Sequence, residues 1–122
     1  NTGIDLPTSK EELNKEAIEK AKEESAKLLS EAQKQADQVK AEAKKAGDQV
    51  RAEAKTQNDN LIKEAGTNPF KKKAAEIAGK KLMDEADKQA IKIEDEGKKQ
   101  ADNIMTKAQE KADALIKKAE SK

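Results

Sequence analysis

The stretch Glu31–Gly66 reads EAQKQADQVKA, EAKKAGDQVRA, EAKTQNDNLIK, EAG when it is divided every eleven residues. Each full block opens with Glu-Ala, has Asp at its seventh place and has Val or Leu at its ninth. Eleven residues make three helical turns of about 3.67 residues each, slightly above the 3.6 of a straight α-helix. The repeat therefore predicts an extended amphipathic helix whose apolar stripe stays nearly straight.

Three lines of residues follow this period on one helix face, one line of mainly large side chains and two of small ones. The lines begin before Glu31; two of them run to Leu61 and Ala65, and the third ends at Gly47. Spacings of 4, 4 and 3 residues place all three lines side by side. The large line is Ala17, Leu28, Val39, Val50, Leu61, and the small lines are Ala21, Ala32, Ala43, Ala54, Ala65 and Ser25, Ala36, Gly47.

The second half of the chain repeats at the same period but in a different phase. Counting in elevens from Leu61 reaches Met83, one residue beyond the true large line. The stripe is therefore interrupted between the two halves. The large line of this half is Leu82, Ile93, Ile104, Leu115, and its small lines are Ala75, Ala86, Gly97, Ala108, Ala119 and Gly79, Ala90, Ala101, Ala112.

The interruption carries the residues that end one helix and begin another. Gly66 suits the left-handed residue after a helix, Asn68 suits an N-cap, and Pro69 suits the first helical position. At the chain's start, Thr8 or Ser9 is a candidate N-cap. We predict an extended segment over 1–8 and one domain over 9–122, with a helix at 9–65, a turn at 66–68 and a helix at 69–120.

The two large lines indicate how the helices pair. If facing residues have numbers that sum to about 136, Val39 meets Gly97, Ala43 meets Ile93 and Leu28 meets Ala108, so that large residues face small ones. The predicted fold is all-α, a long antiparallel two-helix hairpin of about 80 Å with coiled-coil packing at eleven-residue periodicity. The alternative is a single helix kinked at glycine and proline.

Composition excludes most kinds of chemistry. The chain has neither His nor Cys, which removes imidazole bases, thiolates and the usual zinc ligands, and its five glycines are isolated. We therefore predict no enzyme, no catalytic residue, no cofactor, no metal site and no small-molecule substrate. Lys and Arg total 26 against 25 Asp and Glu, a balance that argues against a nucleic-acid surface. No apolar run approaches the roughly 18 residues of a transmembrane helix.

One local cluster is a candidate interaction site, here called the basic tip. It would surround the turn, with Glu64 and Glu76 as its nearby acids. In one interpretation it contacts an anionic partner, such as lipid headgroups, phosphate or an acidic protein. In the other, Phe70 closes the end of the helix pair and the lysines serve the C-terminus of the first helix. The basic tip comprises Phe70, Lys71, Lys72, Lys73, Lys80 and Lys81.

Blocks such as EAKKAGDQVRA and TKAQEKADALI resemble known alanine-rich eleven-residue repeats. They are similar to the b-type peripheral stalk of rotary ATP synthases and to group 3 late-embryogenesis-abundant proteins. They also resemble helical tails of uncharacterised bacterial cell-envelope proteins. The likeness covers about 20–65 and 75–119. It implies an extended helical protein and carries no functional residue over to this chain, which departs from the stalks in its GTNP turn.

The leading hypothesis for function is a non-enzymatic spacer or protein-interaction arm with a protein partner or weak self-association. The alternative is a chaperone-like protein that shields clients or membranes. A membrane-surface helix is disfavoured, because the apolar stripe is mostly alanine. The chain begins at Asn1 rather than Met, from either a removed signal segment or trimming, and we expect a periplasmic or cell-envelope location.

Overall fold

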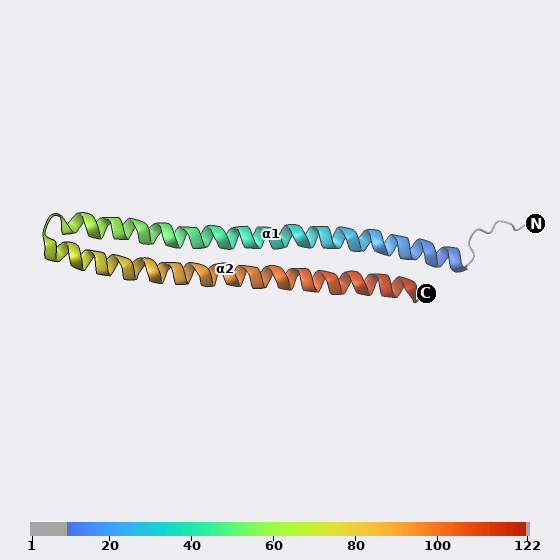
Figure 1. Ribbon diagram of the computed structural model, residues 1–122. Coiled ribbons are helices and arrows are strands. Elements are labelled where there is room, and N and C mark those ends of the chain that lie inside the picture. The colour runs from blue at the N-terminus through green and yellow to red at the C-terminus, as the bar shows by residue number, and fades with distance from the viewer. Residues whose placement is uncertain (1–9, 122) are drawn as a thin grey trace, which may run out of the picture. The chain divides into compact units, whose positions relative to one another are not determined.

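The computed structural model describes residues 10–121, and they form two α-helices (Figure 1). Helix α1 spans Lys10–Ala65 and helix α2 spans Pro69–Glu120. The two helices pack against each other, and residues 10–121 include no strand, so the prediction of an all-helical protein is confirmed. The predicted segment 1–8 and the N-cap at Thr8 or Ser9 lie outside the described residues.

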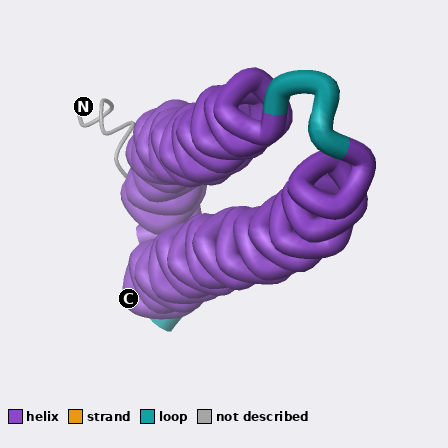
Figure 2. Tube along the Cα trace, turned by 90° about the vertical axis from the view of Figure 1, so that its left-hand side faces the viewer, coloured by secondary structure: helices purple, strands orange, loops and turns teal. Residues whose placement is uncertain are grey.

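The three residues between the helices make the contacts that their types favour. Gly66 has a φ of 61°, and its N–H donates to the carbonyl oxygen of Lys63 at 3.2 Å. Asn68 caps α2, because its Oδ1 accepts from the backbone N–H groups of Phe70 at 3.0 Å and Lys71 at 3.1 Å. These local bonds end α1 at Ala65 and start α2 at once, through the short loop in Figure 2.

The chain divides into two compact units, each built from one segment of α1 and one of α2. The described part of unit 1 is residues 10–37 and 101–121, and unit 2 is Gln38–Gln100. Within unit 1, the buried Ser25 donates its Oγ–H to the carbonyl oxygen of Ala112 at 3.0 Å. Within unit 2, the backbone of Gly97 lies against Ala43 and within reach of the Val39 carbonyl. Both units are therefore held by direct contact between α1 and α2.

Small residues, rather than large ones, form the buried interior of both units. Every buried hydrophobic residue among those described is alanine, and Ser25 is the buried polar one. Gly47, Gly79 and Gly97 are buried as well. No large side chain of the described residues is fully buried. The buried alanines are Ala21, Ala32, Ala36, Ala54, Ala65, Ala75, Ala86, Ala90, Ala101, Ala108, Ala112 and Ala119.

Large aliphatic residues lie beside this interior and remain partly exposed. They line open grooves along each unit, where each large side chain has a small neighbour across the helix pair. The groove of unit 2 is lined by Val39, Ala43, Ile93 and Gly97 together with polar residues. A groove of unit 1 has the same composition, with Leu28, Ala32, Ile104 and Ala108. Because close approach of the helix backbones leaves room only for small groups between them, the larger side chains extend to the sides.

A second flank of large residues widens the packed surface only in part. Ile62 and Ile91 are 47% and 44% exposed and so contribute little to it. The other large residues of this flank are half-buried and so do extend the packed surface beyond the alanine interior. They are Ile18, Leu29, Met83, Met105 and Ile116.

Candidate interaction site

The six residues of the basic tip lie together on the first part of α2, and all are exposed. Phe70 follows the turn directly and is 86% exposed. A ring that closed the end of the helix pair would be largely covered, so the interpretation of Phe70 as a plug is wrong. The end of the pair is instead formed by small residues, because Ala65 and Ala75 are buried there.

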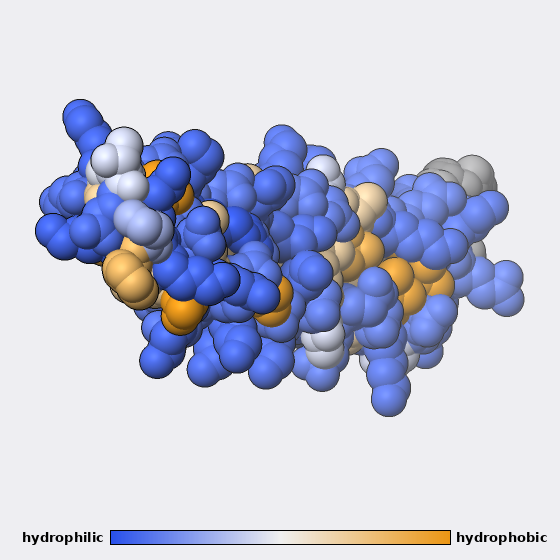
Figure 3. Space-filling view, turned by 60° about the vertical axis from the view of Figure 1, so that its left-hand side comes forward, coloured by the Kyte–Doolittle hydropathy of each residue, from blue (hydrophilic) through white to orange (hydrophobic). Residues whose placement is uncertain are grey.

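Exposed apolar residues form a short stripe on the outer face of α2. Phe70, Ala74 and Ile77 follow the spacing i, i+4, i+7, which places them on one face, and Ile77 is 63% exposed. Ala75 and Gly79 lie on the opposite face and are buried. In Figure 3, where the turn comes toward the viewer, hydrophobic side chains are visible at the surface among hydrophilic ones.

Three lysines of the basic tip, Lys73, Lys80 and Lys81, lie beside this stripe, whereas Lys72 is spaced to share the face of Ala75 and Gly79. Lys71, Lys72 and Lys73 occupy the first turn of α2, which has no acidic residue. Positive charge at this position opposes the helix dipole and disfavours the helix slightly. Between residues 63 and 81 there are six lysines and two glutamates, a net charge of +4. The basic tip therefore combines exposed apolar surface with a strong local excess of positive charge, in a chain that is nearly neutral as a whole.

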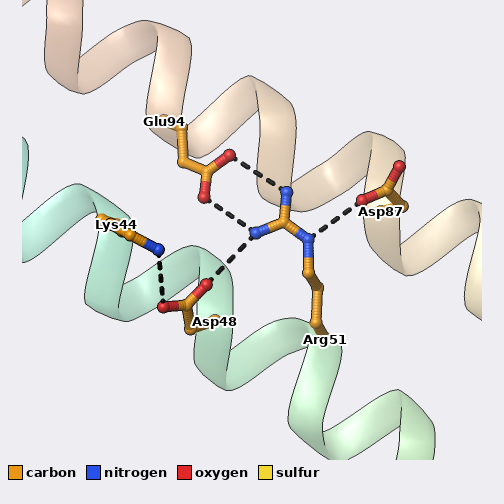
Figure 4. Close-up of polar contacts among 5 residues, drawn as sticks. All are labelled: Lys44, Asp48, Arg51, Asp87 and Glu94. Carbon is orange, nitrogen blue, oxygen red and sulfur yellow. Dashed lines mark hydrogen bonds and ion pairs between the residues drawn. The ribbon is translucent and has the colours of Figure 1, made fainter.

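A second polar cluster, the charged clamp, joins α1 to α2 inside unit 2 (Figure 4). Its centre is Arg51, whose Nη1 and Nη2 donate to the two carboxylate oxygens of Glu94 at 2.8 and 3.0 Å. Arg51 Nε donates to Asp87 at 2.9 Å, and Nη1 also lies 3.3 Å from Asp48. Two parallel bonds to one carboxylate fix direction as well as distance, which a lysine cannot do.

Gly47 provides the space that the charged clamp needs. A Cβ at position 47 would lie 2.8 Å from Oε2 of Glu94 and 3.1 Å from its carboxyl carbon. Any larger residue would push this carboxylate away from Arg51. The glycine therefore belongs to the clamp, although it makes no polar side-chain contact.

The pKa values of the paired groups are shifted by this arrangement. The hydrogen bond from Arg51 holds the pKa of Glu94 below its usual value, with desolvation acting in the opposite direction. Hydrogen bonds to Glu94 and then Asp87 raise the pKa of Arg51 above its usual range. Arg51 thus stays charged at every accessible pH, and of this pair Glu94 is the group whose charge changes in the acid range.

The charged clamp also distinguishes one helix register from its neighbours. A slip of one eleven-residue repeat would bring similar small residues together again, but it would move Met83 or Met105 to the position of Glu94. Arg51 would then lose its two bonds to Glu94. Since Arg51 is the only arginine of the chain, no other position could replace it. We interpret the clamp as a register device, a well-attested use of single polar groups in helix pairs.

Sequence reasoning missed this clamp. A signal was present on the flank line Ile18, Leu29, Lys40, Arg51, Ile62, which is apolar in unit 1 and changes to charge within unit 2. A single arginine at such a position, with a glutamate on the matching line of α2, would have indicated the contact.

Glu94 should make stability depend on pH in the acid range. Its pKa in the folded protein is below the unfolded value of about 4.5, so its stabilising effect is complete above that pH and is lost as the pH falls through the lower folded value. We expect Glu94→Gln to lower the urea denaturation midpoint at pH 7. Near pH 3, the midpoints of the variant and the parent protein should lie closer together. Urea titrations at both pH values measure this.

The matched control for this prediction is Glu110→Gln, an exposed glutamate of α2 in unit 1. In this variant, the change in the urea denaturation midpoint between pH 7 and pH 3 should be the same as in the parent protein. An equal effect of the two variants would show that the Arg51–Glu94 contact has no role in acid sensitivity.

Neither a metal-binding cluster nor a membrane span is present among the described residues. Residues 10–121 contain no group of three or more His, Cys, Asp or Glu placed to hold a metal ion. Neither α1 nor α2 has a segment long and apolar enough to cross a bilayer. Within residues 10–121, the basic tip and the charged clamp are the polar clusters interpreted below.

Comparison of the chain with protein-family models, with curated proteins and with solved structures finds no match. Interpretation of the two features consequently rests on their own geometry and charge.

Proposed function

We propose that this chain is a non-enzymatic spacer or protein-interaction arm in which α1 and α2 run antiparallel as a hairpin. The observation that carries the proposal is the interior made of alanine, glycine and serine. Such an interior allows close contact between the helices over many turns, but it buries no large side chain. Helices of 56 and 52 residues are several times the usual length in globular proteins. Length and stiffness are the properties that this design favours.

The order of contacts along the helices supports the antiparallel arrangement. In unit 2, Ala43 contacts Gly97, Arg51 contacts Asp87, and Asn58 contacts Gly79, so the partner's number falls as the number along α1 rises. In unit 1, Ser25 contacts Ala112, in keeping with the same rule. The three-residue turn returns the chain in the same sense.

Spin-label distances test the proposal, because the chain has no native cysteine. Labels at Glu19→Cys and Lys63→Cys, both exposed, report the stiffness of α1. A rigid arm predicts a narrow distribution near about 65 Å, at 1.5 Å per residue. A second pair, Lys34→Cys and Asp102→Cys, lies on exposed positions of α1 and α2 and reports their pairing.

Circular dichroism separates the arm from the protective protein of the alternative hypothesis. A spacer is fully helical in dilute buffer, whereas a desiccation-type protein gains helix only on drying or with lipid. A largely disordered spectrum in buffer, together with a broad distance distribution along α1, would contradict the arm.

A further inference from the structure

The basic tip has features that the packing of α1 on α2 does not require. Phe70 and Ile77 lie on the face of α2 opposite the buried Ala75 and Gly79, so they add nothing to the helix contact. Lys71, Lys72 and Lys73 oppose the dipole of the helix that they begin. Exposed apolar groups and unfavourable charges at one place indicate that this surface is covered by something else.

We propose that the basic tip docks on an anionic lipid surface. Phe70 and Ile77 enter the headgroup region, and the lysines beside them contact lipid phosphate and carboxylate groups. This inference rests on the proposed interaction arm, and it assigns an anionic lipid surface as the partner of the basic tip. It does not involve the alanine stripe, which is buried between the helices and cannot reach a membrane.

Charge complementarity favours an anionic partner, because the segment 63–81 carries a net charge of +4. Lysines near a negatively charged bilayer each add substantially to binding. Lys73, Lys80 and Lys81 lie beside the Phe70–Ile77 stripe on the same side of α2, so a flat surface can contact all of them together.

Shape favours a bilayer over a folded protein as the source of that charge. Phe70 stands out from the start of α2 with 86% of its surface exposed, and Ile77 follows about 10 Å further along the helix. A protein partner would need two matching pockets at this spacing, within an acidic surface. A bilayer interface accepts projecting apolar side chains without any preformed pocket.

Vesicle co-sedimentation of the full chain tests the proposal, with phosphatidylcholine vesicles that either contain or lack phosphatidylserine. The chain should bind the anionic vesicles and bind the neutral ones far more weakly. Lys80→Glu with Lys81→Glu should lower affinity at least about thirtyfold, since each lysine near an anionic surface contributes about fivefold.

The chain contains a matched control for this variant. The sequence Gly-Lys-Lys occurs at Gly79–Lys81 and again at Gly97–Lys99, in the same helix and with both lysines exposed each time. The second pair lies on the same side of α2 but about 27 Å further along it, so a bilayer that contacts only the Phe70–Lys81 end lies beyond the Debye length from this pair at physiological salt. Lys98→Glu with Lys99→Glu should therefore leave vesicle binding nearly unchanged.

Two further variants separate docking from folding and place the contact. Glutamate is favoured in the first turn of a helix, so Lys71→Glu, Lys72→Glu and Lys73→Glu together should keep α2 folded and still abolish binding. The chain has neither Trp nor Tyr, so Phe70→Trp creates a single fluorophore. Its emission should shift to the blue with anionic vesicles, while that of Ile91→Trp should not.

Absence of binding to anionic vesicles would overturn the proposal, as would equal losses in the two dilysine variants or an unshifted Trp emission at position 70. Binding by the parent chain, lost selectively in the tip variants, supports it. If the spin-label distances hold while vesicle binding is absent, the arm stands and the lipid surface is rejected. The two proposals can therefore fail separately.

Discussion

Gly97→Ala should destabilise the protein by about 2 kcal/mol, whereas the same change at Gly79 should leave stability unchanged or raise it slightly. For a chain of this size the first change lowers the melting temperature by roughly 6–10 °C. Thermal unfolding followed by circular dichroism at 222 nm measures both variants. The two glycines are buried in the same helix and the same unit, so they form a matched pair.

The difference arises from what each added methyl group would meet. At Gly97 it would overlap the Cβ of Ala43, which is fixed to the backbone of α1 and cannot rotate away. The Val39 carbonyl oxygen, 3.6 Å from the same point, limits movement on another side. The helix segments of unit 2 would have to separate locally, and the contacts around them would be lost. The higher helix propensity of alanine, about 1 kcal/mol, offsets only part of this cost.

At Gly79 the obstacle is the side-chain oxygen of Asn58, which is the end of a flexible group. Asn58 is half-buried, so its side chain can turn toward solvent and form hydrogen bonds there. The higher helix propensity of alanine then determines the stability of the Gly79→Ala variant. Equal destabilisation by the two changes would show that close contact with the backbone at Gly97 does not limit the packing of unit 2.

Ala112→Leu should be more damaging, with a loss of about 3 kcal/mol from overpacking. Ala112 is 1% exposed in unit 1, and its carbonyl oxygen accepts the hydrogen bond from Ser25 at 3.0 Å. Leucine would force the helices of unit 1 apart and break this bond, leaving the Ser25 hydroxyl without its partner. Chemical denaturation measures the loss, and a lower denaturation midpoint at an unchanged slope is expected.

The control is Ala114→Leu, two residues further along α2 at an exposed position. Alanine and leucine differ by only a few tenths of a kcal/mol in helix propensity, so little change is expected. Leu28→Ala provides a second comparison, because Leu28 is half-buried and should cost only about 1 kcal/mol. If Leu28→Ala proved worse than Ala112→Leu, the large residues would be the true core and the packing described here would be wrong.

The helix ends were readable from sequence because their causes are local. Gly66, Asn68 and Pro69 each favour one backbone position at a helix end, and the structure places α1 and α2 on either side of them. Most of the small residues in the predicted lines, such as Ala32, Ala54 and Ala86, are buried, while the eleven-residue periodicity itself stays a prediction. Such features depend on neighbours along the chain, which a sequence displays directly.

The degree of burial could not be read in the same way. Pairing Val39 with Gly97 suggested large side chains packed into the seam, but Val39 is only half-buried. How deeply a side chain lies depends on the distance between the helix backbones, and glycine and alanine on both helices make that distance short. The exposure of Phe70 was undetermined for a related reason, since small residues already close the space that the ring was expected to fill.

The candidate sites show the same contrast between features set by neighbours along the chain and features set by helix packing. The basic tip was visible as a local excess of lysine. The charged clamp was not recognised, because Arg51 and Glu94 are 43 residues apart and their meeting depends on the register of the helices. Which exposed charges gain a partner is decided by packing, and packing here is set by small residues that carry no charge.

The most direct test of the central claim is the distance between spin labels at Lys34→Cys and Asp102→Cys. Antiparallel helices in small-residue contact have axes about 8 Å apart, so two outward-facing labels should give a narrow distribution at about 20–30 Å. A single kinked helix would place the same positions about 100 Å apart, at 1.5 Å per residue. A narrow short distance in the monomer supports the hairpin, and its absence would contradict it.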